Sequence, residues 1–477
     1  MKDELCYLSA SDAIAQFKAR TLSPVELTRA VIERAESIAA SINPFADTYF
    51  EEALDHARHS ETKYPRRGGR PRRLEGLPLA VKDSFAIKGR RSTTGSLFNA
   101  ERIDERTDPS IERLLRSGAN LFARTTCPEL CWLYTCHTRM WGVTRNPWRL
   151  DVTPGGSSGG SAAALAAGAA TIATGSDSTG SIRQPAAQCG VVGYQAPQGR
   201  IPVSAQASFD PYINAGPMAR TVADAALMTN VMSGPHPLDH HSLPNRVTVP
   251  STLAGIEGLK IAYSMDLGHY EMIDDVRRET SATLDTLRDA GAELVEVDFD
   301  ASEAIRLAHA HEEFMLADIV AGVVRDHPEL ICDYTPELAE TATSVTAQDY
   351  RNAIRVAGRF WRDHLGPMFS RFDALLCPTV SCPEVPAENW QKHKLVINGK
   401  SLTDTDTAMT ALFNMYNRCP ILAIPSGMTD AGLPSGVQIV GRPHDDVTVF
   451  RIGHAVETRR PWLDCASSRP DPRLWAK

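Results

Sequence analysis

Three short segments of the chain hold residues that could carry nucleophilic chemistry. In the first, residues 80–84, Lys82 directly follows a short apolar run. A lysine in a desolvated site loses its proton more easily and can then act as a base. Taken alone, Lys82 fits better as a surface lysine whose stem lies along apolar surface while its amine reaches water.

The second segment is a glycine-rich loop, residues 154–161, with the sequence Pro-Gly-Gly-Ser-Ser-Gly-Gly-Ser. Glycines allow another group to approach the backbone closely, and such a loop before a helix can bind an anion. A phosphate loop would end in Gly-Lys-Ser/Thr, whereas Gly160 is followed by Ser161 and Ala162. The alternative is a plain flexible loop.

The third segment, residues 175–185, begins just after an apolar run and contains Gly180 directly before Ser181. This order suits a serine held on a tight turn, where successive N–H groups can converge and stabilise an oxyanion. The Gly-x-Ser-x-Gly pattern of α/β-hydrolases is absent around Ser181. The segment therefore resembles a nucleophile elbow in its logic but lacks the α/β-hydrolase motif.

The elements that must position these segments alternate between strands and helices, which predicts α/β layers. In the first half we expect strands at 77–81, 119–123 and 171–174 and helices at 109–116 and 162–167. In the second half we expect strands at 259–263, 292–297, 374–377, 421–424 and 437–440 and helices at 274–290, 303–326 and 347–371. Before them, Ser23, Pro24 and Glu26 are typical of a helix start.

No internal repeat or long linker divides the chain, so the simplest organisation is one domain over residues 1–477. We expect a helical N-terminal segment at 1–65, a core at 75–235, a helical excursion at 265–370 and further core strands at 371–460. A large α/β core with insertions can reach this length.

Together the three segments resemble the amidase-signature family. That family carries a Gly-Gly-Ser-Ser-Gly-Gly loop, an Asp-x-Gly-Gly-Ser-Ile-Arg-x-Pro turn and a lysine after an upstream strand. Here Ser157 precedes Ser181 by 24 residues and Lys82 precedes it by 99, as in the family. Further family-like pieces lie at 145–148, 189–193, 216–224 and 432–441. The likeness is strong over about 75–235 and moderate over 370–460, and a joint match of this kind is far more specific than one motif.

The resemblance implies an α/β fold with a mixed central sheet flanked by helices on both faces. It also implies a Ser-cisSer-Lys triad: Ser181 attacks an amide, Ser157 passes its proton, and neutral Lys82 receives it. The Gly156–Ser157 peptide is expected to be cis. The N–H groups of residues 178–181, namely Ser178, Thr179, Gly180 and Ser181, would form the oxyanion hole. No cofactor and no metal is implied.

Other residues near the triad receive weaker assignments. Asp177 and Arg183 flank the nucleophile, and we expect them to support the turn rather than take part in the chemistry. Residues 130–134, with Cys131, Trp132 and Leu133, align with a stretch that often lines the family's substrate pocket, although ordinary core packing is the alternative. Thr179 departs from the family, which usually has a smaller residue there, so we expect it to affect substrate size more than reaction type.

The composition limits the partners. A net charge of −8 argues against a nucleic-acid surface, and no run of 18 apolar residues suggests a membrane span. The first residues lack the basic and apolar parts of a secretory signal, so we expect a cytoplasmic protein. The ten cysteines show no zinc-ribbon spacing and are expected to be reduced thiols. The partner is then a small-molecule amide, with neither nucleic acid nor membrane, and a homodimer is left open.

The sequence thus predicts an amidase that cleaves a carboxylic amide through an acyl-enzyme on Ser181, with esters or carbamates as further substrates. One alternative is an amidotransferase-type subunit that releases ammonia from glutamine within a complex. Residues 199–216 lack the Tyr-Gly-rich texture usual in that kind of protein. A second alternative, a catalytically silent binding protein, is disfavoured by the intact set of Lys82, Ser157 and Ser181.

Overall fold

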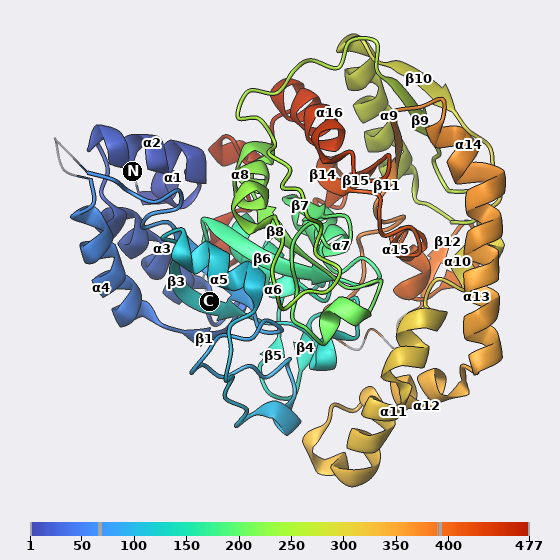
Figure 1. The fold of residues 1–477 in the computed structure, drawn as a ribbon, viewed down its shortest axis with the longest axis horizontal. Coiled ribbons are helices and arrows are strands. Elements are labelled where there is room, and N and C mark those ends of the chain that lie inside the picture. Colours follow the sequence, from blue (N-terminus) through green and yellow to red (C-terminus); the bar gives the residue numbers. More distant parts are fainter. Residues whose placement is uncertain (1, 65–68, 389, 391–393, 476–477) are drawn as a thin grey trace.

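The computed structural model describes residues 2–64, 69–388, 390 and 394–475. Its centre is an 11-stranded mixed sheet with the order β1-β3-β2-β6-β8-β7-β14-β15-β11-β9-β10 (Figure 1). The strands are β1 (Phe45–Thr48), β2 (Pro78–Lys82), β3 (Asn120–Thr125), β6 (Ile172–Asp177), β7 (Val192–Gln195), β8 (Asn214–Ala219), β9 (Lys260–Tyr263), β10 (Glu293–Glu296), β11 (Ala374–Pro378), β14 (Ile421–Met428) and β15 (Pro434–Gly441). Both halves of the chain therefore contribute to one sheet.

Two short hairpins lie outside this sheet: β4 (His137–Thr138) with β5 (Gly142–Val143), and β12 (Leu395–Ile397) with β13 (Lys400–Leu402). The helices are α1 (Lys2–Cys6), α2 (Ala10–Ala19), α3 (Pro24–Ile38), α4 (Phe50–Glu61), α5 (Pro109–Arg116), α6 (Gly159–Ala166), α7 (Arg183–Cys189), α8 (Val222–Met232), α9 (Asp274–Asp289), α10 (Ser302–Arg306), α11 (Ala310–Asp326), α12 (Thr335–Ser344), α13 (Ala347–Phe360), α14 (Gly366–Phe369), α15 (Ala411–Asn414) and α16 (Asp446–Arg459). The α/β fold with a mixed central sheet is as the sequence predicts.

The first helices begin where local chemistry favours a start. Ser23 Oγ accepts the Glu26 N–H at 3.1 Å, and Glu26 Oε2 accepts the Ser23 N–H at 2.8 Å. This reciprocal capping box satisfies two backbone donors at the start of α3, and Pro24 occupies a position that needs no donor. The expectation that residues 1–65 are helical is wrong at one place. Strand β1 lies within them and pairs antiparallel with β3.

Helix α6 is buried on every side, which explains its composition of glycine, alanine, serine and one leucine. Small side chains let a helix approach its neighbours closely, and α6 packs against β2, β3, β6 and α7. This central placement fixes the glycine-rich loop, which leads directly into α6, against the strands that carry the other two segments.

The helical excursion expected at 265–370 contains more elements than the sequence predicts. The stretch 303–326 divides into α10 and α11, and α12 was not predicted. The stretch 347–371 divides into α13, a π-helical turn at Trp361–Leu365 and α14. In Figure 1, α11 and α12 lie together at one side of the sheet, where α11 contributes to the site described below.

Candidate active site

Lys82 and Ser157 are hydrogen bonded in the interior of the protein. Lys82 is the last residue of β2, and its Nζ lies 2.7 Å from Ser157 Oγ and 2.8 Å from Ser176 Oγ. The side chains of Lys82 and Ser157 are almost completely buried. Because β2 and β6 run parallel, their ends meet at one edge of the sheet, which places Lys82 beside Ser176 near the end of β6. The structure therefore does not support a surface role for Lys82.

The glycine-rich loop, residues 154–161, holds Ser157 by close backbone contacts. The Gly156–Ser157 peptide is cis, as expected. A Cβ on Gly156 would lie 2.3 Å from the Leu133 carbonyl oxygen, so only glycine fits there. The Ser158 N–H donates to the Ser181 carbonyl at 3.1 Å and joins this loop to the segment that carries Ser181. The loop is thus ordered by packing and is not a plain flexible linker.

Ser181 lies on a turn, residues 177–183, that we call the nucleophile turn. Gly180 has φ +135°, and a Cβ there would lie 1.9 Å from Thr410 Oγ1, so the turn requires glycine directly before the serine. Asp177 accepts the N–H of Gly180 at 2.8 Å and that of Ile182 at 3.1 Å. The carboxylate of Asp177 therefore fixes the backbone on both sides of Ser181.

The Asp177 carboxylate is itself held by Arg183. Both side chains are fully buried, and Arg183 Nη2 lies 3.0 Å from Asp177 Oδ1. Burial opposes ionisation of Asp177, but the charge and hydrogen bonds of Arg183, with a hydrogen bond from Asn414, outweigh it and keep the pKa below its ordinary value. Arg183 also donates to the Thr410 carbonyl and to Gln438. The contacts of Asp177 and Arg183 are with the turn and its surroundings, in keeping with the expected supporting role.

The expected oxyanion hole needs one correction. The N–H of Gly180 already donates to Asp177, so it is not a free donor in this structure. In the described part of the chain, no other hydrogen bond uses the N–H groups of Ser178, Thr179 or Ser181. These three groups remain the candidates for stabilising an oxyanion. The Gly180 N–H is engaged because the buried Asp177 carboxylate needs hydrogen-bond donors, and the nearest donors are N–H groups of its own turn.

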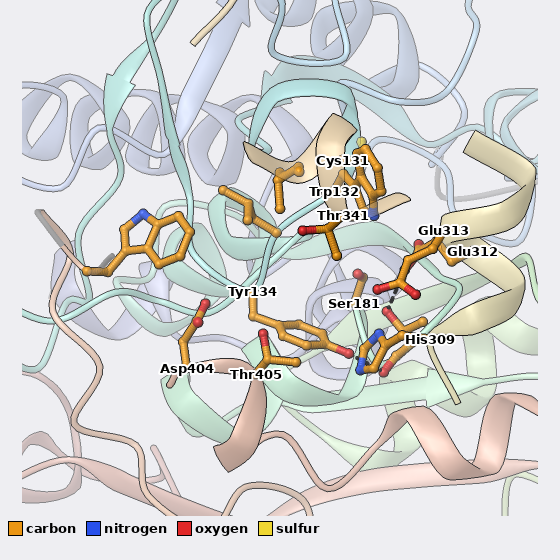
Figure 2. Close-up of a pocket in the computed structure, with 14 residues that line it drawn as sticks. Cys131, Trp132, Tyr134, Ser181, His309, Glu312, Glu313, Thr341, Asp404 and Thr405 are labelled. Carbon is orange, nitrogen blue, oxygen red and sulfur yellow. Dashed lines mark hydrogen bonds between the residues drawn. The ribbon is translucent and has the colours of Figure 1, made fainter. Parts of the chain in front are cut away.

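Two cavities meet at Ser181, and both also include Cys131 and Glu312. The first, about 310 Å³, is lined by Trp132, Leu133 and Tyr134, and we call it the aromatic cavity. Figure 2 shows Trp132 and Tyr134 around it. Cys131, Trp132 and Leu133, which the resemblance assigned to the substrate pocket, all border it. The use of these three residues in substrate binding stays a prediction.

The second cavity, about 240 Å³, contains Ser157 and Ser176 and extends to Phe85, Ile213 and Leu316. We call it the relay cavity. Of the two cavities, Ser157 borders only the relay cavity. A group protonated by Ser157 would therefore lie on this side of Ser181.

Sequence reasoning missed two residues of this site. Ser176 lies in the third segment, between Gly175 and Asp177. The signal that could have found it is its place near the end of β6, because β6 pairs parallel with β2, the strand that ends at Lys82. Glu312 comes from α11, and its hydrogen bonds from Ser178 Oγ and, at 3.2 Å, from Thr179 Oγ1 connect residues far apart in the sequence. No local pattern indicates such a contact.

The comparisons with known proteins place the chain in one family. A family model described as Amidase matches residues 26–450. An acylamidase of Rhodococcus erythropolis is 30% identical over 97% of this chain and 98% of its own. The A subunit of the glutamyl-tRNA(Gln) amidotransferase of Chloroflexus aggregans is 33% identical over 98% of this chain and 99% of its own.

Among solved structures, a bacterial aryl acylamidase of the amidase-signature family superposes with a TM-score of 0.89, 27% identity and 98% coverage of both chains. The chain belongs to the amidase-signature family, and it is a hydrolase of that family. In the described residues, no helix combines the length and the apolar character that a membrane crossing requires.

Proposed function

We propose that this protein hydrolyses the C–N bond of a carboxylic amide through an acyl-enzyme on Ser181. The observation that carries the proposal is the buried Lys82–Ser157 hydrogen bond of 2.7 Å, held beside the turn that presents Ser181. Among the described residues, the partners of the Lys82 amine are the hydroxyls of Ser157 and Ser176, and Lys82 belongs to no ion pair. The names of two relatives, an acylamidase and an aryl acylamidase, also support amide substrates.

In the proposed reaction, Ser181 Oγ attacks the amide carbonyl carbon. Its proton passes to Ser157 while the proton of Ser157 passes to Lys82, which must be unprotonated at the start. The C–N bond then breaks, the proton returns through Ser157 to the leaving nitrogen, and the acyl group stays on Ser181 as an ester. Water attacks this ester with the same relay, which releases the acid and restores the serine.

The transition state carries negative charge on the former carbonyl oxygen, and preorganised N–H groups stabilise such charge. Ser178, Thr179 and Ser181 supply the candidate N–H groups. The leaving nitrogen must face Ser157, which assigns the leaving group to the relay cavity and the acyl group to the aromatic cavity. Esters and carbamates pass through the same kind of tetrahedral intermediate and are expected as further substrates.

The direct test is a hydrolysis screen with anilides, primary amides, esters, carbamates and glutamine, run for the wild type and for Ser181→Ala. We expect release of amine from at least one amide by the wild type and none above background by the variant. Amide hydrolysis that persists in Ser181→Ala would contradict the proposal, and so would an enzyme that cleaves only esters.

The second candidate is an amidotransferase-type activity, which the 33% identity to the amidotransferase chain favours. Free glutamine carries an α-carboxylate, which usually requires a basic partner. Neither cavity has a lysine or arginine among the described residues that line it. This favours hydrolysis of other amides. Glutaminase activity that emerges only after addition of partner subunits would reverse the preference.

A further inference from the structure

Glu312 is a buried carboxyl group that the proposed reaction does not use. Helix α11 brings it against the nucleophile turn, where the hydroxyls of Ser178 and Thr179 donate to its two oxygens. It borders both cavities, and Figure 2 shows it close to Ser181. A carboxylate can accept about four hydrogen bonds, so these two hydroxyls leave capacity for a ligand.

Glu312 and its neighbour Glu313 lie at the aromatic cavity without a positively charged group that offsets their charge among the described residues. Asp404 borders this cavity as well, and the described lining contains neither lysine nor arginine. His309 is the one histidine of that lining, and burial lowers its pKa to about 4, so it is neutral near pH 7. A buried carboxylate without a cationic partner is unfavourable, and a positively charged ligand would supply that partner.

The remaining walls suit an organic cation. The side chains of Trp132, Tyr134 and Trp390 border the same cavity. Aromatic faces attract ammonium groups and also pack against apolar or aryl groups. The indole N–H of Trp390 is buried and has no hydrogen-bond partner among the described residues, and as a donor it suits an acceptor atom of a ligand, such as the amide oxygen, and not the cationic group. A substrate with a basic nitrogen on an aryl or alkyl body fits this combination of groups.

We propose that Glu312 is a specificity-determining residue that selects amides whose acyl part carries an ammonium group or another nitrogen donor. This inference rests on the proposed function, because it assigns the acyl part to the aromatic cavity. In this arrangement the Glu312 carboxylate binds the substrate nitrogen while it continues to accept from Ser178 and Thr179. Recognition of the acyl group is thereby connected directly to the turn that carries Ser181.

The ionisation of Glu312 adds a pH signature. Burial raises its pKa to about 7, against the hydrogen bond from Ser178, and the charge of Asp210 raises it further. Glu313 also faces it, and His311 lies 2.8 Å from Asp210. The carboxylate is the charged form above this pKa, so preference for a cationic substrate grows as the pH rises through about 7.

The test compares two anilides of nearly equal shape, 4-(aminomethyl)benzoyl anilide and 4-ethylbenzoyl anilide. We expect the wild type to prefer the ammonium compound at least about tenfold in kcat/KM, the value of one charge-assisted hydrogen bond. Glu312→Gln should remove most of this preference. A merely structural role of Glu312 would lower both rates by the same factor and leave the ratio unchanged, which would overturn the inference.

The ratio of the two kcat/KM values, followed between pH 6 and 8, removes any pH dependence that both substrates share. We expect the ratio to rise with pH in the wild type and to stay flat in Glu312→Gln. Glu340→Gln, an exposed change on α12, is the matched control for the loss of one negative charge and should behave as the wild type.

Binding of both compounds to Ser181→Ala, measured by calorimetry, separates recognition from turnover. Tighter binding of the ammonium compound that is lost in the Ser181→Ala, Glu312→Gln double variant supports the inference. Equal hydrolysis of both anilides by the wild type would overturn the inference and leave the proposed function standing. A wild type that hydrolyses no amide at all would overturn both.

Discussion

Asp177 and Arg183 form an ion pair at the base of the nucleophile turn in which both side chains are fully buried and Arg183 Nη2 lies 3.0 Å from Asp177 Oδ1. The pair connects the end of β6 to the start of α7, so the backbone that presents Ser181 is held from both sides. A buried pair of this kind contributes little net stability compared with apolar residues, but removal of one partner leaves an uncompensated charge.

Arg183→Met should therefore lower the free energy of unfolding by about 3–5 kcal/mol, because it leaves the Asp177 carboxylate buried without its partner. Urea denaturation followed by circular dichroism measures this change. The matched control is Arg325→Met, which removes an arginine from an exposed ion pair with Asp326 and should change stability by less than about 1 kcal/mol. Equal effects of the two variants would contradict the account.

Ser176→Ala tests the second hydroxyl on Lys82. Loss of its 2.8 Å hydrogen bond should lower kcat about 10–100-fold, because the Lys82 amine loses one of its two positioning partners. Lys82→Ala should lower kcat by several orders of magnitude, because a catalytic unit loses most of its rate when any one member is removed. Steady-state kinetics on one anilide gives both values, and thermal melting shows whether each variant folds. A Ser176→Ala enzyme with wild-type kcat would show that Ser176 does not contribute to the reaction.

Cys131 should react with iodoacetamide, and the modification should block the aromatic cavity. A hydrogen bond from the Cys127 thiol lowers the pKa of Cys131 against the effect of burial, and the thiolate is the reactive form. Inactivation should therefore rise with pH and reach its half-maximal rate below about 8.5, the ordinary thiol value.

The matched variants for this experiment are Cys131→Ala, which should resist inactivation, and Cys127→Ala, which should move the midpoint to higher pH. Cys465→Ala removes the exposed cysteine and should change nothing. Inactivation that persists in Cys131→Ala would show that another group is responsible.

Thr179 lies in the aromatic cavity, and its hydroxyl donates to Glu312. Thr179→Ser keeps the hydroxyl and removes a methyl group, so it should shift preference toward bulkier acyl groups at little cost in rate. Thr179→Gly removes both and adds backbone freedom to the candidate oxyanion donors, so its rate on the smallest substrates should fall further. The kcat/KM values for acetyl, butyryl and benzoyl anilides test this. If each substitution changes kcat/KM by the same factor for all three acyl groups, Thr179 does not shape the cavity.

The sequence predicted those helices and strands that are determined by neighbouring residues, such as a helix-starting proline followed by an apolar stripe. Helix α5 begins and ends at the predicted residues 109 and 116, because Pro109 starts it and an apolar stripe follows. Strand β1 was missed because it has four residues, none fully buried, and forms only by pairing with β3. The π-helical turn between α13 and α14 likewise had no signal in the apolar pattern.

In the site, too, the residues in short motifs were predicted, whereas contacts that depend on three-dimensional packing were not. Lys82, Ser157 and Ser181 were found through the family resemblance, which covers short motifs. The engagement of the Gly180 N–H by Asp177 could not be predicted, because it depends on the three-dimensional shape of the turn. Glu312 was missed for a similar reason, since α11 reaches the nucleophile turn only through the packing of the helical excursion.

The central claim is that Ser181 alone is the activated nucleophile. Intact-protein mass spectrometry after treatment with a fluorophosphonate tests it most directly. We predict one added phosphonyl group on the wild type, located on Ser181 by peptide mapping, and none on folded Ser181→Ala. Undiminished labelling of Ser181→Ala, or a wild-type label on Ser157 or Ser176, would contradict the account.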